Sequence, residues 1–295
     1  MKDTTMQGRT CLITGATSGI GLATARLLAA RGAQIVMVGR DLARTQAARE
    51  EIIEHSGNEQ VDFLLADLGS LAQVRKLAAE FRTRFSALHV LINNAGLVTA
   101  QRELTEDGFE RMFGVNHLAH FLLTLELLPV LRRHAPSRVV LVSSDAHRFG
   151  RLDADDLQSE RGFGFPTLVS AMRVYGGSKL ANLLFGQALS RRLDGTGVTV
   201  NSVHPGAVAT NMGKNNQGWY SFLPKLISPF FSTPEQGATA SLYVASSPGL
   251  EGRSGAYFVR EQEVTPSARA RDSQFAEQLF HRSCEMVGHT GDIEA

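Results

Sequence analysis

The sequence lacks the cysteine patterns and the charge imbalance that mark several protein classes. Among its 295 residues are only two cysteines, Cys11 and Cys284, near opposite ends and without C-x-x-C spacing. This argues against a structural metal site and a disulfide framework, and indicates a reducing compartment. Thirty basic residues balance 29 acidic ones, so the charge of +1 gives no sign of a nucleic-acid partner. His147 and His204 have no third partner at metal-ligand spacing, so we interpret them as surface or structural histidines.

Long hydrophobic runs are also missing. No apolar stretch reaches the roughly 18 residues of a membrane-spanning helix without a polar break. Residues 1–9 are polar and lead directly into the first apolar run, so we expect neither a signal peptide nor a membrane anchor. We therefore expect a soluble, cytoplasmic protein, and 43% hydrophobic residues are enough for a substantial core.

What the sequence does contain is an alternation of short β-branched runs with longer helical segments. The predicted strands are 11–14, 34–38, 61–65, 88–92, 138–142 and 198–203, and the predicted helices include 22–31, 42–55, 71–85 and 106–133. Alternating strands and helices predict βαβ units, and nearly continuous apolar strands predict a sheet buried on both faces. No linker divides the chain, so we expect residues 1–295 to form one α/β domain, a Rossmann-type doubly wound parallel sheet flanked by helices.

Residues 14–21 read Thr-Gly-Ala-Thr-Ser-Gly-Ile-Gly and fall between the first strand and the first helix. The pyrophosphate of a dinucleotide binds at this position in a doubly wound sheet, on the N-terminus of the helix. The glycine spacing differs from G-x-G-x-x-G, and an ordinary turn is the alternative. We favour phosphate binding, with the predicted contacts Gly15, Thr17, Ser18, Gly19, Ile20 and Gly21.

The end of the second strand normally carries the group that contacts the adenosine ribose. Gly39 stands where an acidic residue would bond a free 2′-hydroxyl, and Arg40 follows as a partner for a 2′-phosphate. This favours NADP(H) over NAD(H), although Arg40 is also compatible with an ordinary solvated arginine. We interpret Asp41 as the N-cap of the next helix.

Two further strand ends carry small or polar residues. Asp67 is suited to accept a hydrogen bond from the adenine amino group, and an N-cap of the following helix is a compatible alternative. After the fourth strand, Asn94, Ala95 and Gly96 let the backbone lie along the adenosine half of the cofactor.

A possible acid/base group lies on the helix that contains Tyr175 and Lys179. Their spacing of four residues places both side chains on one helix face, where an adjacent cation favours the phenolate and lowers the pKa of the phenol. The alternative is a Tyr and Lys pair without function on a solvated helix face. Ser144 follows the fifth strand at the edge where open α/β sheets bind ligands. Asn116 lies among apolar helical residues, and either a structural hydrogen bond or a site role satisfies its amide.

The chain turns back over the expected nicotinamide position at Pro205 and Gly206. The apolar residues that follow, including Trp219 and Phe222, have no clean helical period. We expect residues of about 207–233 to form a lipophilic substrate pocket, with core packing as the alternative. A capping box beginning at Thr233 then predicts a helix to Ser246.

In sequence order, these motifs resemble the short-chain dehydrogenase/reductase family over nearly the whole chain. They are T-G-x-x-x-G-I-G at 14–21, N-N-A-G at 93–96, Asn116, Ser144, Y-x-x-x-K at 175–179 and Pro-Gly at 205–206. Residues 114–121, 178–182, 203–206 and 255–258, with Pro266 and Ser267, look like the retinol dehydrogenase branch. Membrane-bound members of that branch carry an N-terminal anchor, which we do not expect here.

The resemblance implies roles for individual residues. Tyr175 would be the proton donor and acceptor, and Lys179 would contact the nicotinamide ribose and lower the pKa of Tyr175. Ser144 would bond the reacting substrate oxygen, and Asn116 would hold a water of a proton relay behind Lys179. The implied cofactor contacts also include Asp67 and Leu68 at the adenine, Val208 and Thr210 at the carboxamide, Asn94, Ala95, Gly96, Pro205 and Gly206.

We therefore expect an NADP(H)-dependent oxidoreductase that interconverts a carbonyl and an alcohol on a lipophilic small molecule. The alternatives are an NADP(H)-sensing protein without chemistry and a biosynthetic reductase acting on another bond. The family resemblance also suggests a homodimer through the helices of Asn116 and Tyr175.

Overall fold

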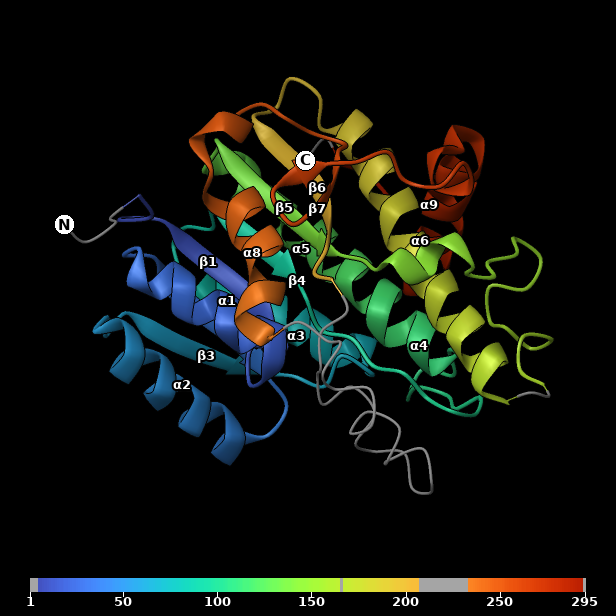
Figure 1. Cartoon of the computed structure of the whole chain (residues 1–295), viewed down its shortest axis with the longest axis horizontal. Helices are drawn as coiled ribbons and strands as arrows, with labels where there is room; N and C mark the ends of the chain where they lie inside the picture. The colour runs from blue at the N-terminus through green and yellow to red at the C-terminus, as the bar shows by residue number, and fades with distance from the viewer. Residues whose placement is uncertain (1–4, 165–166, 207–232, 294–295) are drawn as a thin grey trace.

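The computed structural model describes residues 5–164, 167–206 and 233–293 (Figure 1). Its strands are β1 Thr10–Thr14, β2 Gln34–Gly39, β3 Val61–Leu65, β4 Val90–Asn93, β5 Ser137–Val142, β6 Val198–His204, β7 Tyr257–Val259 and β8 Gln262–Glu263. They form one sheet in the order β3-β2-β1-β4-β5-β6-β7-β8, with every neighbouring pair parallel except β7 and β8. The first six strands follow the doubly wound order. The predicted Rossmann-type α/β fold is thus confirmed.

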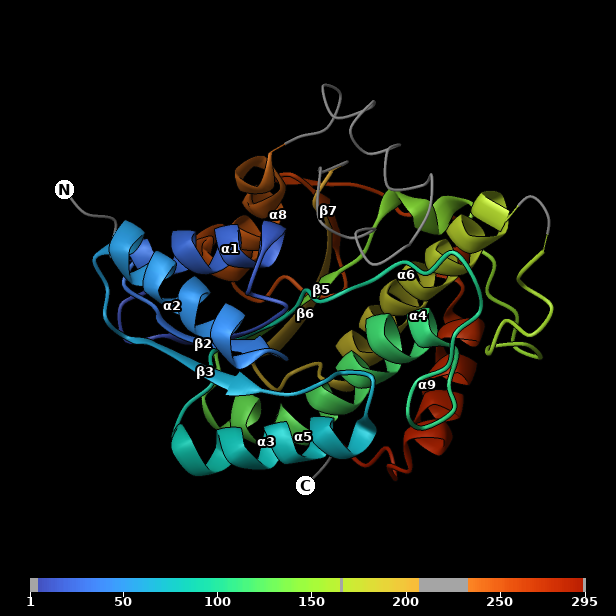
Figure 2. The same cartoon turned by 90° about the horizontal axis from the view of Figure 1, so that it is seen from below.

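Helices cover both faces of this sheet. The α-helices are α1 Gly19–Ala30, α2 Leu42–Ser56, α3 Leu71–Arg84, α4 Arg111–Phe113, α5 Ala119–Arg133, α6 Thr167–Arg192, α8 Pro234–Ser246 and α9 Ser273–Val287. Figure 2 shows α1, α2 and α8 on one side of the sheet, and α3, α5 and α6 on the other. Two large apolar clusters fill the two interfaces. Because both faces are covered, every residue of β1 and of β4 is buried.

Two of the predicted helix starts are confirmed by their caps. The Asp41 carboxylate accepts the N–H of Arg44 at 2.8 Å, at the start of α2. Thr233 and Gln236 form the reciprocal capping box of α8, which ends at Ser246 as predicted. Both predictions are correct because the capping side chains accept hydrogen bonds from backbone N–H groups that have no partner within the helix.

Other local predictions are wrong. Asp67 does not cap α3, because its carboxylate accepts the N–H of Gly69, while the N–H of Leu71 bonds to Asp107 instead. We expected the helix of Tyr175 to begin near that residue, and it begins at Thr167, about two turns earlier. The predicted helix 106–133 begins only at Arg111 and contains a π-helix, η1 Gly114–Leu118.

One continuous helical stretch, 111–133, is long and apolar enough to cross a membrane by composition alone. Within the described part of the chain it is the one helix of this kind, and 89% of its apolar window is buried inside the protein. It packs as a core helix against α3 and contacts α9.

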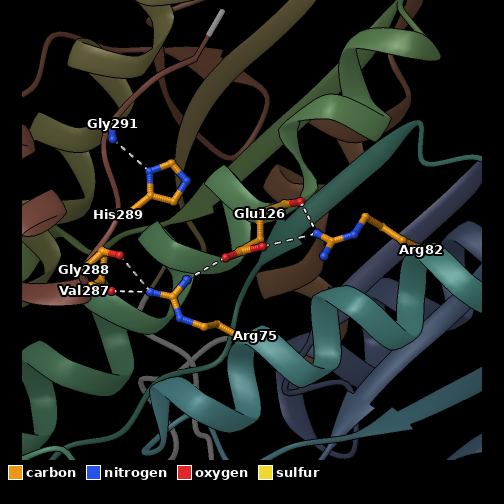
Figure 3. Close-up of polar contacts among 7 residues, drawn as sticks. All are labelled: Arg75, Arg82, Glu126, Val287, Gly288, His289 and Gly291. Carbon is orange, nitrogen blue, oxygen red and sulfur yellow. Dashed lines mark hydrogen bonds and ion pairs between the residues drawn. The ribbon is translucent and has the colours of Figure 1, made fainter. Parts of the chain in front are cut away.

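The C-terminal helix α9 is fastened to α3 and α5 by arginines (Figure 3). The Arg75 guanidinium lies between α5 and α9, donating to Glu126 at 2.7 Å and to the carbonyl oxygens of Val287 and Gly288. Arg82 also bonds Glu126. Because α9 packs on both α5 and α6, it covers part of the face through which the homodimer was expected; that dimer stays a prediction.

Candidate functional site

The glycine turn between β1 and α1 packs directly on the segment that follows β4. Gly15 has φ +66°, and a Cβ there would lie 2.9 Å from Cα of Ala95. A Cβ at Gly21 would lie 2.3 Å from the carbonyl oxygen of Gly15. Side chains at these two positions are therefore excluded, and the glycines give the turn its close approach to Ala95.

Hydrogen bonds fasten the same two segments together. The Thr14 hydroxyl oxygen accepts the N–H groups of Asn94 at 2.9 Å and Ala95 at 3.0 Å. In return, the Asn94 amide donates to the carbonyl oxygens of Thr14 at 2.8 Å and Gly15 at 3.4 Å. The predicted cofactor residues that follow β1 and β4 are thus held together by hydrogen bonds at the carboxyl edge of the sheet.

The first turn of α1 is suited to hold a phosphate. Ser18 is its N-cap residue, but the Ser18 side chain makes no capping hydrogen bond. No acidic residue occupies the first turn, so the helix dipole and its N–H groups are available to an anion. Thr17, Gly19 and Ile20 are partly exposed beside them. These residues fit the pyrophosphate of a dinucleotide.

The strand ends predicted to contact adenosine lie next to this turn. A Cβ at Gly39 would lie 2.1 Å from the Thr45 hydroxyl and 2.9 Å from Cγ2 of Thr17. An acidic side chain therefore has no room at position 39 in this packing. Arg40 is exposed, and among the described residues no hydrogen bond or ion pair occupies its guanidinium.

The Asp67 carboxylate accepts the N–H of Gly69 at 2.8 Å and is otherwise exposed. Leu68 beside it is buried. Both residues follow the end of β3, beside the end of β2, where the register pairs Gly39 with Leu65. The predicted adenine contacts thus share one edge with the glycine turn.

Three of the predicted catalytic side chains, those of Ser144, Tyr175 and Lys179, meet where the end of β5 lies beside the middle of α6. Lys179 is 2% exposed and donates to the Val142 carbonyl oxygen at 3.0 Å. Its Nζ lies 5.8 Å from the centre of the Tyr175 ring. A Cβ on Gly96 would lie 3.3 Å from the same Nζ, so the segment after β4 borders the amine. The structure brings Tyr175, Lys179, Ser144 and Gly96 together.

The pKa of the phenol differs from the expectation. Burial raises the pKa of Tyr175 to about 12, and its hydrogen bond with Ser144 lowers it only in part. Loss of hydration around the phenolate is the dominant cause of this shift, and the lowering of the Tyr175 pKa by Lys179 stays a prediction. Burial also lowers the pKa of the Lys179 amine from 10.5 to about 8.

Asn116 lies in the π-helix, and each of its polar groups has a protein partner. Its amide oxygen accepts the Leu97 N–H at 2.8 Å, and its amide nitrogen donates to the Leu97 carbonyl oxygen and to Ser178. Its main-chain carbonyl oxygen accepts bonds from His120 and Asn182, both at 3.1 Å. This geometry favours a structural hydrogen-bonding role for the Asn116 amide over a role in the site. That Asn116 holds a water of a proton relay stays a prediction.

Of the remaining predicted site residues, only those up to residue 206 lie within the described part of the chain. Pro205 and Gly206 directly follow β6 at the carboxyl edge, with Gly206 at φ +86°. Val208 and Thr210 lie outside the described residues. So does nearly all of the predicted substrate loop, including Trp219 and Phe222.

The two histidines at this edge differ: both ring nitrogens of His147 are hydrogen-bonded, whereas the buried Nδ1 of His204 has no partner among the described residues. His147 is buried and bonds the Ser144 carbonyl oxygen at 2.7 Å, whereas His204 lies 3.7 Å from the Asp145 carboxylate. Across the described ranges, no group of three or more His, Cys, Asp or Glu side chains is arranged to hold a metal ion.

Sequence reasoning missed a hydrogen-bond bridge between the cofactor turn and the π-helix. His120 is buried and contacts the Asn116 carbonyl oxygen through Nδ1 and the Thr14 hydroxyl through Nε2, at 2.9 Å. Asn182, on α6, donates a hydrogen bond to the same carbonyl oxygen of Asn116. The spacing of four between Asn116 and His120 is a signal that could have revealed the first of these contacts.

Comparison with known proteins agrees with this geometry. The sequence profile of the short chain dehydrogenases matches residues 9–153 and 166–221. Retinol dehydrogenase 12 of Mus musculus is 44% identical over 281 residues, which cover 95% of this chain and 87% of that protein. Retinol dehydrogenase 14 of Homo sapiens is 44% identical, over 96% of this chain and 87% of that protein.

Solved structures show the same fold. An uncharacterized protein from Mycobacterium paratuberculosis superimposes with a TM-score of 0.78 at 35% identity, covering 97% of this chain and 96% of that one. RhlG of Pseudomonas aeruginosa, solved as an NADP active-site complex, has a TM-score of 0.69 at 25% identity, covering 88% and 97% of the two chains.

Proposed function

Because this chain belongs to the retinol dehydrogenase-like branch of the short-chain dehydrogenase family and is an oxidoreductase, we propose that it uses NADP(H) to interconvert a carbonyl and an alcohol. The observation that supports this most is the convergence of the Tyr175 phenol, the Lys179 amine and the Ser144 hydroxyl beside the glycine turn. All three side chains are present, so the sensing alternative has no structural feature in its favour.

Ser144 and Tyr175 act on the substrate oxygen in this proposal. The Ser144 hydroxyl oxygen accepts the Ala146 N–H at 3.2 Å, and its hydrogen bond with Tyr175 is replaced by a donated bond to the substrate oxygen. Tyr175, whose pKa of about 12 keeps it protonated at neutral pH, delivers the proton during carbonyl reduction. Lys179 stabilises the phenolate that remains. Bound NADPH supplies the hydride.

The preference for NADP(H) rests on the end of β2. Packing of Thr17 and Thr45 excludes a side chain at position 39, which removes the acidic partner of a free ribose 2′-hydroxyl. The exposed Arg40 guanidinium is then available to a 2′-phosphate.

Arg40→Ala tests this assignment. Loss of one charge-assisted hydrogen bond should raise the Kd of NADPH about 10- to 100-fold while leaving that of NADH nearly unchanged. Arg133→Ala removes the same charge at the end of α5 and serves as the control. Equal losses for both cofactors, measured by titration of cofactor fluorescence, would refute the 2′-phosphate role.

For the substrate, the names of the mammalian relatives favour retinol and retinaldehyde, within a wider class of apolar aldehydes and ketones. The test is a panel of such carbonyls and their alcohols, with each cofactor, followed by nicotinamide absorbance. We expect oxidation of NADPH by at least one apolar aldehyde. An unchanged absorbance with every pair would reject the proposed reaction.

A further inference from the structure

The segment that carries Ser144 is held by a hydrogen bond from strand β7. Ser144 is the N-cap residue of a short 3-10 helix, η2 Asp145–Arg148. The next residue, Asp145, accepts a hydrogen bond from the Tyr257 phenol on β7, at 3.2 Å. Tyr257 is 2% exposed, whereas Arg148, which pairs with the same carboxylate at 3.4 Å, is half exposed, and His204 lies 3.7 Å from that carboxylate. The buried bond is therefore the one less open to competition by water.

His147 provides a second link to the same segment. Its Nδ1–H donates to the Ser144 carbonyl oxygen at 2.7 Å, and its Nε2 accepts the Ser267 N–H at 3.2 Å. This pair of bonds fixes the neutral tautomer, and burial lowers the pKa of His147, which keeps it neutral. The His147 and Tyr257 rings pack edge to face, 5.4 Å between centres.

The opposite side of η2 rests on the helix of Tyr175 without intervening side chains. A Cβ at Gly176 would lie 2.3 Å from the Ala146 carbonyl oxygen, and one at Gly150 would lie 2.2 Å from the Gly176 carbonyl carbon. The short helix is thus confined between α6 on one side and the Tyr257 and Ser267 segment on the other. A shift of η2 necessarily moves the Ser144 hydroxyl relative to Tyr175.

We propose that Tyr257 and His147 are positioning residues that hold the Ser144 hydroxyl at the distance from Tyr175 required for catalysis. The inference rests on the proposed oxidoreductase function and extends it to a segment about 110 residues further along the chain, as the separation of 112 between Asp145 and Tyr257 shows. Neither residue contacts the reacting atoms. Each acts through Ser144.

The test is a double-mutant cycle on turnover with NADPH and the best aldehyde of the panel. Tyr257→Phe should lower kcat roughly tenfold through misplacement of Ser144, with the Kd of NADPH unchanged. In the Ser144→Ala background, Tyr257→Phe should have an effect of less than about twofold, because the group it positions is gone. Equal effects in both backgrounds would overturn the proposal.

Two variants separate positioning from general destabilisation. Tyr243→Phe removes a hydroxyl from α8, on a ring that packs against Phe258 in the same strand as Tyr257, and should leave kcat unchanged. His147→Asn, whose amide can replace the Nδ1–H donor, should retain more turnover than His147→Leu. Equal losses in the two His147 variants would count against the hydrogen bond.

A readout that does not depend on turnover distinguishes this inference from the proposed function. The 13Cζ signal of Tyr175, assigned by its absence in Tyr175→Phe, reports the bond with Ser144. Tyr257→Phe should move this signal in the direction that Ser144→Ala moves it, and the double variant should move it no further. An unmoved signal in Tyr257→Phe would reject the positioning role even if the wild-type protein turned over no carbonyl.

Discussion

Burial of the charged Lys179 amine lowers the free energy of unfolding of the protein. Its amine is 2% exposed and its described hydrogen bond is to Val142, so burial lowers its pKa to about 8. Lys179→Met should abolish turnover and yet raise the free energy of unfolding at pH 7 by up to about 3 kcal/mol. Chemical denaturation measures this gain, and the exposed Lys76→Met on α3 is the matched control.

The pH dependence of that gain has a definite sign. The unfolded chain binds a proton near pH 10.5 that the native state binds only near pH 8. Wild-type stability should therefore rise with pH through this window, and the advantage of Lys179→Met should shrink towards zero. A gain that stays constant from pH 7 to about pH 10 would show that packing, not charge, is responsible.

The same amine sets a pH limit on carbonyl reduction. Below its pKa of about 8 the Lys179 amine is charged and stabilises the Tyr175 phenolate, and above it the charge is lost. The value of kcat/KM for reduction with NADPH should thus fall as the pH rises through about 8. A flat profile across that range, in stopped-flow or steady-state assays, would disagree with this role.

Gly96 is the residue whose change tests the site geometry without removing a functional group. A Cβ there would lie 3.3 Å from Lys179 Nζ and 3.5 Å from the Asn116 amide oxygen. Gly96→Ala should displace the amine and lower kcat roughly 10- to 100-fold. Gly164→Ala, where a Cβ meets no atom within 4 Å, should leave kcat unaltered; comparable losses in the two variants would contradict the argument.

Residue identity at the site could be predicted from the sequence where chemistry needs a short spacing, as for Tyr175 and Lys179. The pKa of the Tyr175 phenol could not be predicted from the sequence, because it depends on burial by segments that are distant in the chain. The links from Thr14 to His120 and from Tyr257 to Asp145 join residues 106 and 112 positions apart. No local pattern encodes such pairs.

Among the secondary-structure elements, α9 offers a direct test of how the C-terminal helix is held. Arg75 of α3 donates to carbonyl oxygens at the end of α9 and to Glu126 of α5. Arg75→Ala should increase amide hydrogen exchange in residues 273–287 while leaving the sheet protected. Arg84→Ala, in the same helix but paired with Glu80, is the control. Unchanged exchange in α9 would show that its apolar packing and the ion pairs of Glu277 with Arg191 and Arg192 hold it without Arg75.

Element boundaries were predictable where caps define them and not where tertiary contacts do. Asp41 and Thr233 mark the starts of α2 and α8 in the sequence itself. The π-helix that contains Asn116 has no such mark, because it depends on partners from Leu97, Ser178 and Asn182. The short β7 has three residues and is stabilised mainly by pairing with β6.

At the scale of the whole molecule, the alternation of strands and helices was enough to predict the parallel sheet. A right-handed crossover after each strand leaves few alternative topologies, and it brings the carboxyl ends of neighbouring strands to one edge. This is why the glycine turn, Gly96, Ser144 and Pro205 lie together although they are distant in sequence. The antiparallel β8 and the helix α9 lie outside that repeating pattern and were not predicted.

The central claim is that Tyr175 transfers the proton at the edge of this sheet. The most direct measurement compares wild type with Tyr175→Phe, recording NADPH binding by fluorescence and aldehyde reduction by nicotinamide absorbance on the same samples. We predict that the Kd of NADPH stays within about twofold while turnover falls by a factor on the order of 100 to 10,000. Turnover close to wild type in Tyr175→Phe, with the cofactor bound, would contradict the claim.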